Sequence, residues 1–196
     1  VAGRVQEEMD SADEQLRDFA ISLMIIFALL AIPLRSYSQP LIIMSVIPFG
    51  VVGAMFGHVI LGMTMSGLSM FGIIAVAGIV VNDSLVMVDF VNKARAEGMA
   101  VKQAVMQAGA KRFRAILLTS ITTFIGVMPI IMETSLQAKI VIPMAVSLAF
   151  GVLFATVITL ILIPCQYVAL EDAKRLTRKL LGKSQPISIQ PAPTAK

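Results

Sequence analysis

Long apolar stretches separated by short polar connections dominate the pattern of hydrophobic and polar positions along this chain. A helix that crosses the hydrocarbon core of a bilayer needs roughly 20 apolar residues. No Lys, Arg, Asp or Glu occurs from Ser36 to Asn82, and the sequence GMTMSG (62–67) divides this run in two. The pattern predicts an all-α integral membrane protein. Its five spanning helices are expected at about 19–34, 40–61, 68–91, 115–132 and 140–164.

The composition points the same way and excludes several other classes of protein. Hydrophobic residues make up 57% of the chain, charged residues make up 14%, and the mean hydropathy is +0.87, which is far from a soluble domain. The only cysteine, Cys165, cannot form an internal disulfide, and the only histidine, His58, lacks companions for a metal motif. The sequence also carries no phosphate-binding loop and no Ser/His/Asp set, so we expect neither a metal nor an organic cofactor.

Basic residues gather in two places, the connection 93–114 and the tail 165–196. The connection contains Lys93, Arg95, Lys102, Lys111, Arg112 and Arg114. Because positively charged loops stay on the cytoplasmic side, we expect both segments inside the cell. Five helices then place the N-terminus on the periplasmic side. This topology accounts for the net charge of +4, so we expect no nucleic-acid partner.

The ends of the chain and the basic connection have patterns of their own. Residues 1–18 show helical spacing with an acidic face, which predicts a periplasmic helical lead-in to the first span. Connection 93–114 carries apolar residues on one side, which predicts a short amphipathic helix at the inner surface. The tail 165–196 is basic and cytoplasmic, with a polar, proline-containing end predicted to be disordered. Since Val1 opens the chain without a signal peptide, we expect a C-terminal piece of a longer membrane protein.

Small residues recur at fourth positions in two of the predicted helices. Gly53 and Gly57 have GxxxG spacing in the second, and Ser147, Gly151 and Ala155 form a stripe in the fifth. Such stripes allow helices to approach closely in lipid, where packing and hydrogen bonds replace the hydrophobic effect. We interpret these five residues as helix-packing positions.

Asn82 and Asp83 interrupt the apolar run of the third predicted helix. Asp83 lies 15 residues after Leu68, about 22 Å from the outer end at ~1.5 Å per residue. A charged Asp at such depth costs on the order of 2.5–3.5 kcal/mol, and such acids usually mark ion pathways. The alternative is a neutral Asp that only hydrogen-bonds a neighbouring helix. Asp89, near the helix end, can reach the headgroups.

Three segments resemble the resistance–nodulation–division (RND) efflux transporters: SQPLIIMSVIPFGVVGAMFG, AGIVVNDSLVMVDFVNKARAEG and KRFRAILLTSITTFIGVMPI. The resemblance covers about residues 17–167, in the family's order and spacing. It implies that the chain is the C-terminal part of a twelve-helix bundle in the bacterial inner membrane. It further implies a substrate/proton antiporter that exports drugs or other amphiphiles, driven by the proton gradient and without a cofactor.

The same resemblance implies site residues and partners. By position, Asn82 and Asp83 correspond to the central pair of the family's proton relay, and Arg112 and Thr119 to two further relay residues. The implied partners are membrane lipid, the N-terminal half of the transporter, and a homotrimer with a periplasmic adaptor and an outer-membrane channel. One departure affects the mechanism. Multidrug members have Lys-Asn where this chain has Asn82–Asp83, so the relay cannot be transferred unchanged. A smaller departure is Ala115, where the family usually has proline.

Three alternatives remain at this point. The first keeps the superfamily but changes the cargo to metal, lipid or translocated protein. The second is an intramembrane aspartyl protease built on Asp83 and Asp89. These acids are six residues apart, about 9 Å along a helix axis, and point in different directions, whereas a catalytic dyad needs adjacent carboxylates. The third is a scaffold subunit that does not transport, in which the intramembrane acid would have no explanation.

Overall fold

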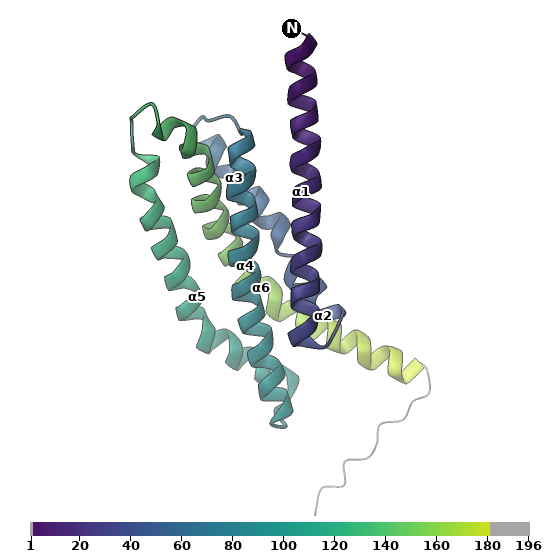
Figure 1. The fold of residues 1–196 in the computed structure, drawn as a ribbon. Helices are drawn as coiled ribbons and strands as arrows, with labels where there is room; N and C mark the ends of the chain where they lie inside the picture. The colour runs from purple at the N-terminus through teal and green to yellow at the C-terminus, as the bar shows by residue number, and fades with distance from the viewer. Residues whose placement is uncertain (1, 181–196) are drawn as a thin grey trace, which may run out of the picture.

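The computed structural model describes residues 2–180, and this part of the chain forms six α-helices (Figure 1). The helices are α1 (Ala2–Leu34), α2 (Ser38–Met44), α3 (Ile47–Ile60), α4 (Gly67–Ala96), α5 (Val101–Ile131) and α6 (Ala138–Leu180). Within the described residues, five segments are long and apolar enough to cross a membrane, with α2 and α3 together forming one of them. The predicted all-α membrane fold with five spanning segments is confirmed.

Helices α3, α4 and α6 form the centre of the bundle, where each packs against the other two. Helix α1 contacts α2 and α4, and α5 contacts α4 and α6, so α1 and α5 lie at the periphery (Figure 1). We call the end that holds connection 97–100 the basic end, and the opposite end, with connections 61–66 and 132–137, the far end. The N-terminal part of α1 extends beyond the other helices at the far end (Figure 1).

The second predicted span, 40–61, is two helices rather than one. Helix α2 ends at Met44 and α3 begins at Ile47, so Ser45 and Val46 interrupt the regular pattern. Pro48 explains the break, because it has no N–H to donate to the carbonyl of Met44 and its ring crowds that carbonyl. Proline is well accommodated in the first turn of a helix, which is its place in α3.

Residues 101–114 and 165–180 are helical and continuous with the spanning helices next to them. Helix α5 runs unbroken from Val101 through Ile131, because no glycine or proline lies near the predicted boundary at Ala115. Its first turns bury Val101, Ala104, Val105 and Ala108 in the core of the bundle, so they do not form a separate helix on a lipid surface. Helix α6 likewise continues to Leu180, and its last part leaves the bundle at a shallower angle (Figure 1). The predicted disordered end at 184–196 lies outside the described residues.

Small residues hold α3, α4 and α6 at close distances. A Cβ atom added at Gly53 would lie 2.9 Å from the carbonyl oxygen of Phe150, and one added at Gly151 would lie 3.1 Å from that of Gly50. At Gly72, which the sequence did not single out, an added Cβ would meet the carbonyl oxygen of Met144. All five predicted packing positions, Gly53, Gly57, Ser147, Gly151 and Ala155, are buried. We propose that these contacts fix the spacing of the three central helices.

Candidate functional site

The Asn82–Asp83 pair lies on the side of α4 that turns away from the centre of the bundle. Asn82 is exposed and Asp83 is half-buried, whereas the flanking Val81 and Ser84 are buried. The hydroxyl of Ser84 donates to the carbonyl of Val80, one turn earlier in the same helix. Among residues 2–180, the Asp83 carboxylate has neither a hydrogen-bond nor an ion-pair partner. An acid in the middle of a spanning helix is therefore presented at an edge that the described helices leave open.

Arg112 lies on the same side of the α4–α5 pair, nearer the basic end. Its guanidinium carbon is 5.8 Å from the centre of the Phe90 ring, and the amino group of Lys111 is 5.2 Å from the same ring. Both distances fall in the range of a cation–π contact. The Nε atom of Arg112 is buried and has no hydrogen-bond partner within the described chain. This cation therefore retains an unused donor beside the helix that carries Asp83.

The Phe90–Arg112 contact also sets the heights of the other site residues. Asp83 precedes Phe90 by seven residues, and Thr119 follows Arg112 by seven. Since α4 and α5 run in opposite directions and each rises ~1.5 Å per residue, Asp83 and Thr119 lie at about the same depth. Seven residues are close to two full turns, so each pair shares one face of its helix. By this count, we infer that three of the four sequence-predicted relay residues, Asp83, Arg112 and Thr119, face one side of the α4–α5 pair. Asn82 lies next to them.

The threonines of α5 do not bond to Asp83. Thr119 donates to the carbonyl of Ala115 at 3.0 Å, and the hydroxyls of Thr122 and Thr123 bond carbonyls of the same helix. This is the common behaviour of threonine within a helix. Ser120, by contrast, points towards α6 and shares a hydrogen bond with Thr156. The face of α5 that carries Thr119 is therefore exposed, while Ser120 on the next face connects α5 to α6.

Asp89 occupies a different environment from Asp83. It pairs with Lys93 one turn later, with the oxygen and nitrogen atoms 2.7 Å apart and both side chains substantially exposed. An exposed pair of this kind contributes at most about 1 kcal/mol to stability. The acid near the helix end is thus neutralised locally, whereas the acid in mid-helix is not.

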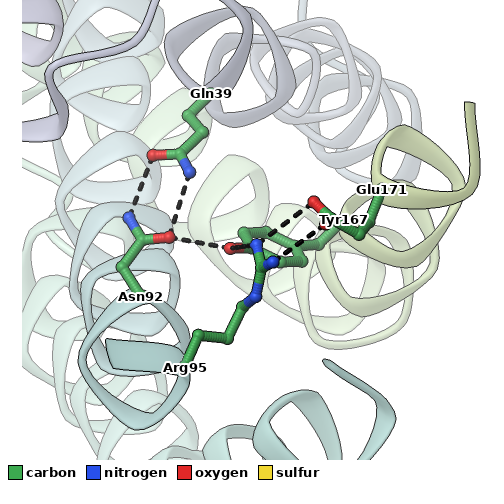
Figure 2. A network of polar contacts seen from close by, with 5 residues as sticks. All are labelled: Gln39, Asn92, Arg95, Tyr167 and Glu171. Atoms are coloured by element: carbon green, nitrogen blue, oxygen red, sulfur yellow. Dashed lines mark hydrogen bonds and ion pairs between the residues drawn. The ribbon is translucent and has the colours of Figure 1, made fainter. Parts of the chain in front are cut away.

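The structure contains two polar clusters that the sequence did not predict. At the basic end, Gln39, Asn92, Arg95, Tyr167 and Glu171 form a connected network between α2, α4 and α6 (Figure 2). At the far end, the buried His58 bonds the carbonyl of Ala54 at 2.9 Å and the hydroxyl of Ser69 at 3.0 Å. Asn92 is one polar residue among the charges that end α4, and the side-chain partner of His58, Ser69, belongs to another helix. No local signal would have revealed either cluster.

Comparison of the sequence with known protein families identifies the family of this chain. A model of the AcrB/AcrD/AcrF family matches residues 1–171. The chain belongs to that family. The AcrB/AcrD/AcrF proteins are RND transporters, which are secondary transporters and not enzymes, so the resemblance inferred from the sequence is confirmed. Membership excludes the intramembrane protease and establishes a multi-pass membrane protein.

Individual relatives belong to efflux systems, but they are described with different substrates. The chain is 29% identical over 178 residues to the multidrug resistance protein MdtC of Pantoea ananatis, covering 90% of this chain and 17% of the relative. It is 30% identical over 156 residues to the MdtC of Erwinia tasmaniensis, covering 79% and 15%. Among solved structures, a heavy metal efflux pump matches with a TM-score of 0.75 and 26% identity, covering 85% of this chain and 17% of the pump. The chain thus spans about a sixth of the length of these relatives.

Proposed function

We propose that this chain is the C-terminal membrane part of a proton-driven efflux transporter and that Asp83 is its proton carrier. Asn82, Arg112 and Thr119 complete the relay on this side. The observation that carries the proposal is the carboxylate of Asp83, which lies in the middle of a spanning helix with no partner on the described chain. Ionisable groups at such depth are costly and usually mark substrate or ion pathways and proton relays.

The open edge of α4 and α5 supports a site shared between two halves of a transporter. In secondary transporters, coupling ions bind near the middle of the membrane where two repeats meet. The face that carries Asn82, Asp83 and Thr119 is the one that α3 and α6 do not cover. We infer that the N-terminal half packs on this face and supplies the groups with which Asp83 exchanges its proton.

Asp83 must change its charge for this mechanism to work. When protonated, it can be buried against the other half at low cost, and when ionised it needs water or a cation. Arg112 lies about 10 Å away along the helix axes, since seven residues of ~1.5 Å separate its level from that of Asp83. Its charge lowers the cost of the ionised state without forming a permanent ion pair. The carboxylate therefore stays free to alternate between both states.

We propose drugs or other amphiphiles as the cargo, and a position in the bacterial inner membrane with the N-terminus periplasmic and the C-terminus cytoplasmic. The curated relatives named above are multidrug resistance proteins, which supports this cargo. Metal ions are the second candidate, because the matching solved structure is a heavy metal efflux pump. The homotrimer, the periplasmic adaptor and the outer-membrane channel are proposed from the family alone.

Proteoliposomes containing the full-length transporter test the proposal. A pH-sensitive dye inside the vesicles reports proton movement when an amphiphilic cation, or alternatively a divalent metal, is added under a pH gradient. We expect the amphiphile to drive proton movement and Asp83→Asn to abolish it. Proton movement driven only by the metal would replace the cargo assignment and leave the relay intact. Unchanged movement in Asp83→Asn would remove Asp83 from the relay.

A further inference from the structure

The polar network at the basic end centres on the side chain of Asn92 in α4. Its amide exchanges two hydrogen bonds with the amide of Gln39 in α2, at 3.0 and 2.9 Å. The Oδ1 atom of Asn92, which accepts one of these two bonds, also accepts a hydrogen bond from the Tyr167 hydroxyl of α6 at 2.7 Å. Figure 2 shows the three side chains converging between their helices. We call Gln39, Asn92 and Tyr167 the polar clamp.

An ion pair supports the clamp from the other side of Tyr167. Arg95 donates to both carboxylate oxygens of Glu171, at 3.1 and 2.8 Å, and its guanidinium also reaches the Tyr167 oxygen at 3.5 Å. Because Arg95 and Glu171 belong to α4 and α6, this bidentate pair joins the two helices that Tyr167 and Asn92 already connect. In this arrangement the Tyr167 hydroxyl donates to Asn92, and its oxygen faces the Arg95 guanidinium.

The clamp lies on the opposite side of α4 from Asp83. Asn92 follows Asp83 by nine residues, which is about two and a half turns at 3.6 residues per turn. The two side chains therefore leave the helix in roughly opposite directions. Phe90, seven residues after Asp83, shares the Asp83 side and contacts Arg112 there. Whatever fixes the direction of Asn92 thus fixes the direction of Asp83 and Phe90 as well.

Apolar packing specifies the rotation of α4 less well at the basic end than at the far end. At the far end, Gly72 packs closely on Met144 and Ser69 bonds His58, so turning the helix would lose specific contacts there. Residues 79–96 contain no glycine, and their apolar side chains lie at the edge of the bundle as well as in its core. A hydrogen bond, by contrast, is lost when its donor and acceptor move apart by about an ångström. Turning α4 would break the bonds from Asn92 to two helices together and leave amide groups unpaired, which is costly at a partly buried site.

We propose that the polar clamp sets the rotation of α4 about its own axis and thereby points Asp83 at the open edge beside α5. Asn92 and Tyr167 are positioning residues in this proposal, since neither touches the carboxylate. The functional consequence rests on the proposed role of Asp83. The rotation itself does not, and it can be measured separately.

Thiol cross-linking measures the rotation directly. In the full-length transporter without other cysteines (Cys165→Ser included), Phe90→Cys is paired with Arg112→Cys and treated with a short bifunctional thiol reagent. The contact between these side chains predicts efficient cross-linking. We expect Asn92→Leu to lower this yield and to raise the yield from a cysteine at position 89 or 91, as α4 turns. Exchanging the partners, Gln39→Asn with Asn92→Gln, keeps both amides and should restore the original pattern.

Two further variants keep the test decisive. Tyr167→Phe removes one hydroxyl and little volume, so it reports on the clamp even where Asn92→Leu fails to accumulate in the membrane. Gln166→Leu is the matched control, because its amide oxygen accepts a hydrogen bond from Ser45 that joins the α2–α3 break to α6 without involving α4. An unchanged pattern in both clamp variants, or an equal shift in Gln166→Leu, would overturn the proposal.

Transport measurements connect the rotation to function. With Asp83 and Asp89 intact, clamp variants should transport more slowly in proportion to their altered cross-linking, and the exchanged pair should recover. Altered cross-linking with unchanged transport would support the proposed rotation of α4 but show that transport does not depend on it. Failure of the Asp83 assignment has a separate signature, because Asp83→Asn would then transport normally while the cross-linking pattern of the clamp variants still changed.

Discussion

Asp83 of α4 and Thr119 of α5 each lie seven residues from the contact between Phe90 and Arg112, and from this count we infer that they are level with one another. This register follows from the opposite directions of the two helices and their equal rise per residue. Thr119 donates to its own helix, so its oxygen still has a lone pair free to accept a hydrogen bond from protonated Asp83 or from a bridging water.

The register predicts different outcomes for two neighbouring threonines. Thr119→Ala should lower transport by the full-length protein about fivefold, the effect of losing a hydrogen bond worth about 1 kcal/mol. Thr122→Ala, also exposed and also bonded to its own helix, is not level with Asp83 and should change transport little. Initial rates of substrate efflux at matched expression provide the measurement. Equal losses in both variants would contradict the register.

Arg112→Ala should also impair transport, to a degree between that of Asp83→Asn and that of Asp89→Asn. The guanidinium stabilises the ionised state of the site from a distance, and the Phe90 contact anchors its position. Arg112→Lys keeps the charge and serves as the control. Recovery of most of the activity by lysine is expected, whereas equal loss in both variants would assign Arg112 a role in shape and not in charge.

Two glycines should respond in opposite ways to the same substitution. Gly72→Ala places a methyl group against the carbonyl oxygen of Met144 and 2.7 Å from the Cβ of Ser147, so α4 and α6 must separate. Overpacking of this kind costs about 1–3 kcal/mol. Gly109→Ala, near the basic end of α5, meets nothing within 4 Å and should be neutral or slightly stabilising, because alanine favours helix. Thermal unfolding in detergent compares the two, and equal melting temperatures would argue against close packing at Gly72.

The buried histidine at the far end should contribute to stability through both ring nitrogens. Nδ1 faces the carbonyl of Ala54, which can only accept, so Nδ1 carries the proton and Nε2 accepts from Ser69. His58→Leu removes both bonds and leaves the Ser69 hydroxyl unpaired on that side, at a cost of about 1–3 kcal/mol. Ser22→Ala, an exposed residue bonded to its own helix, is the control and should stay within about 0.5 kcal/mol. A melting temperature unchanged by His58→Leu would refute the bridge.

Most of the fold was predictable because apolar length and charge placement determine which segments span a membrane. The break at Ser45 and Val46 was not, because a proline in an apolar run does not always end a helix: Pro129 and Pro143 lie inside α5 and α6. Nor was the continuity of α5, which depends on the packing of its first turns in the bundle. The sequence singled out Asp83 by its cost in an apolar run. It could not reveal Asn92 or His58, whose partners Tyr167 and Ser69 come from other helices. Those contacts depend on packing, which no local pattern encodes.

Asp83→Asn in the full-length transporter is the most direct test of the account. Asparagine preserves the shape and can hydrogen-bond, but it cannot gain or lose a proton. We predict normal amounts of protein in the membrane with transport largely lost at every external pH. Asp89→Asn should transport nearly as well as the parent, because that acid is exposed and paired with Lys93. Full transport by Asp83→Asn at matched expression, across several external pH values, would contradict the central claim.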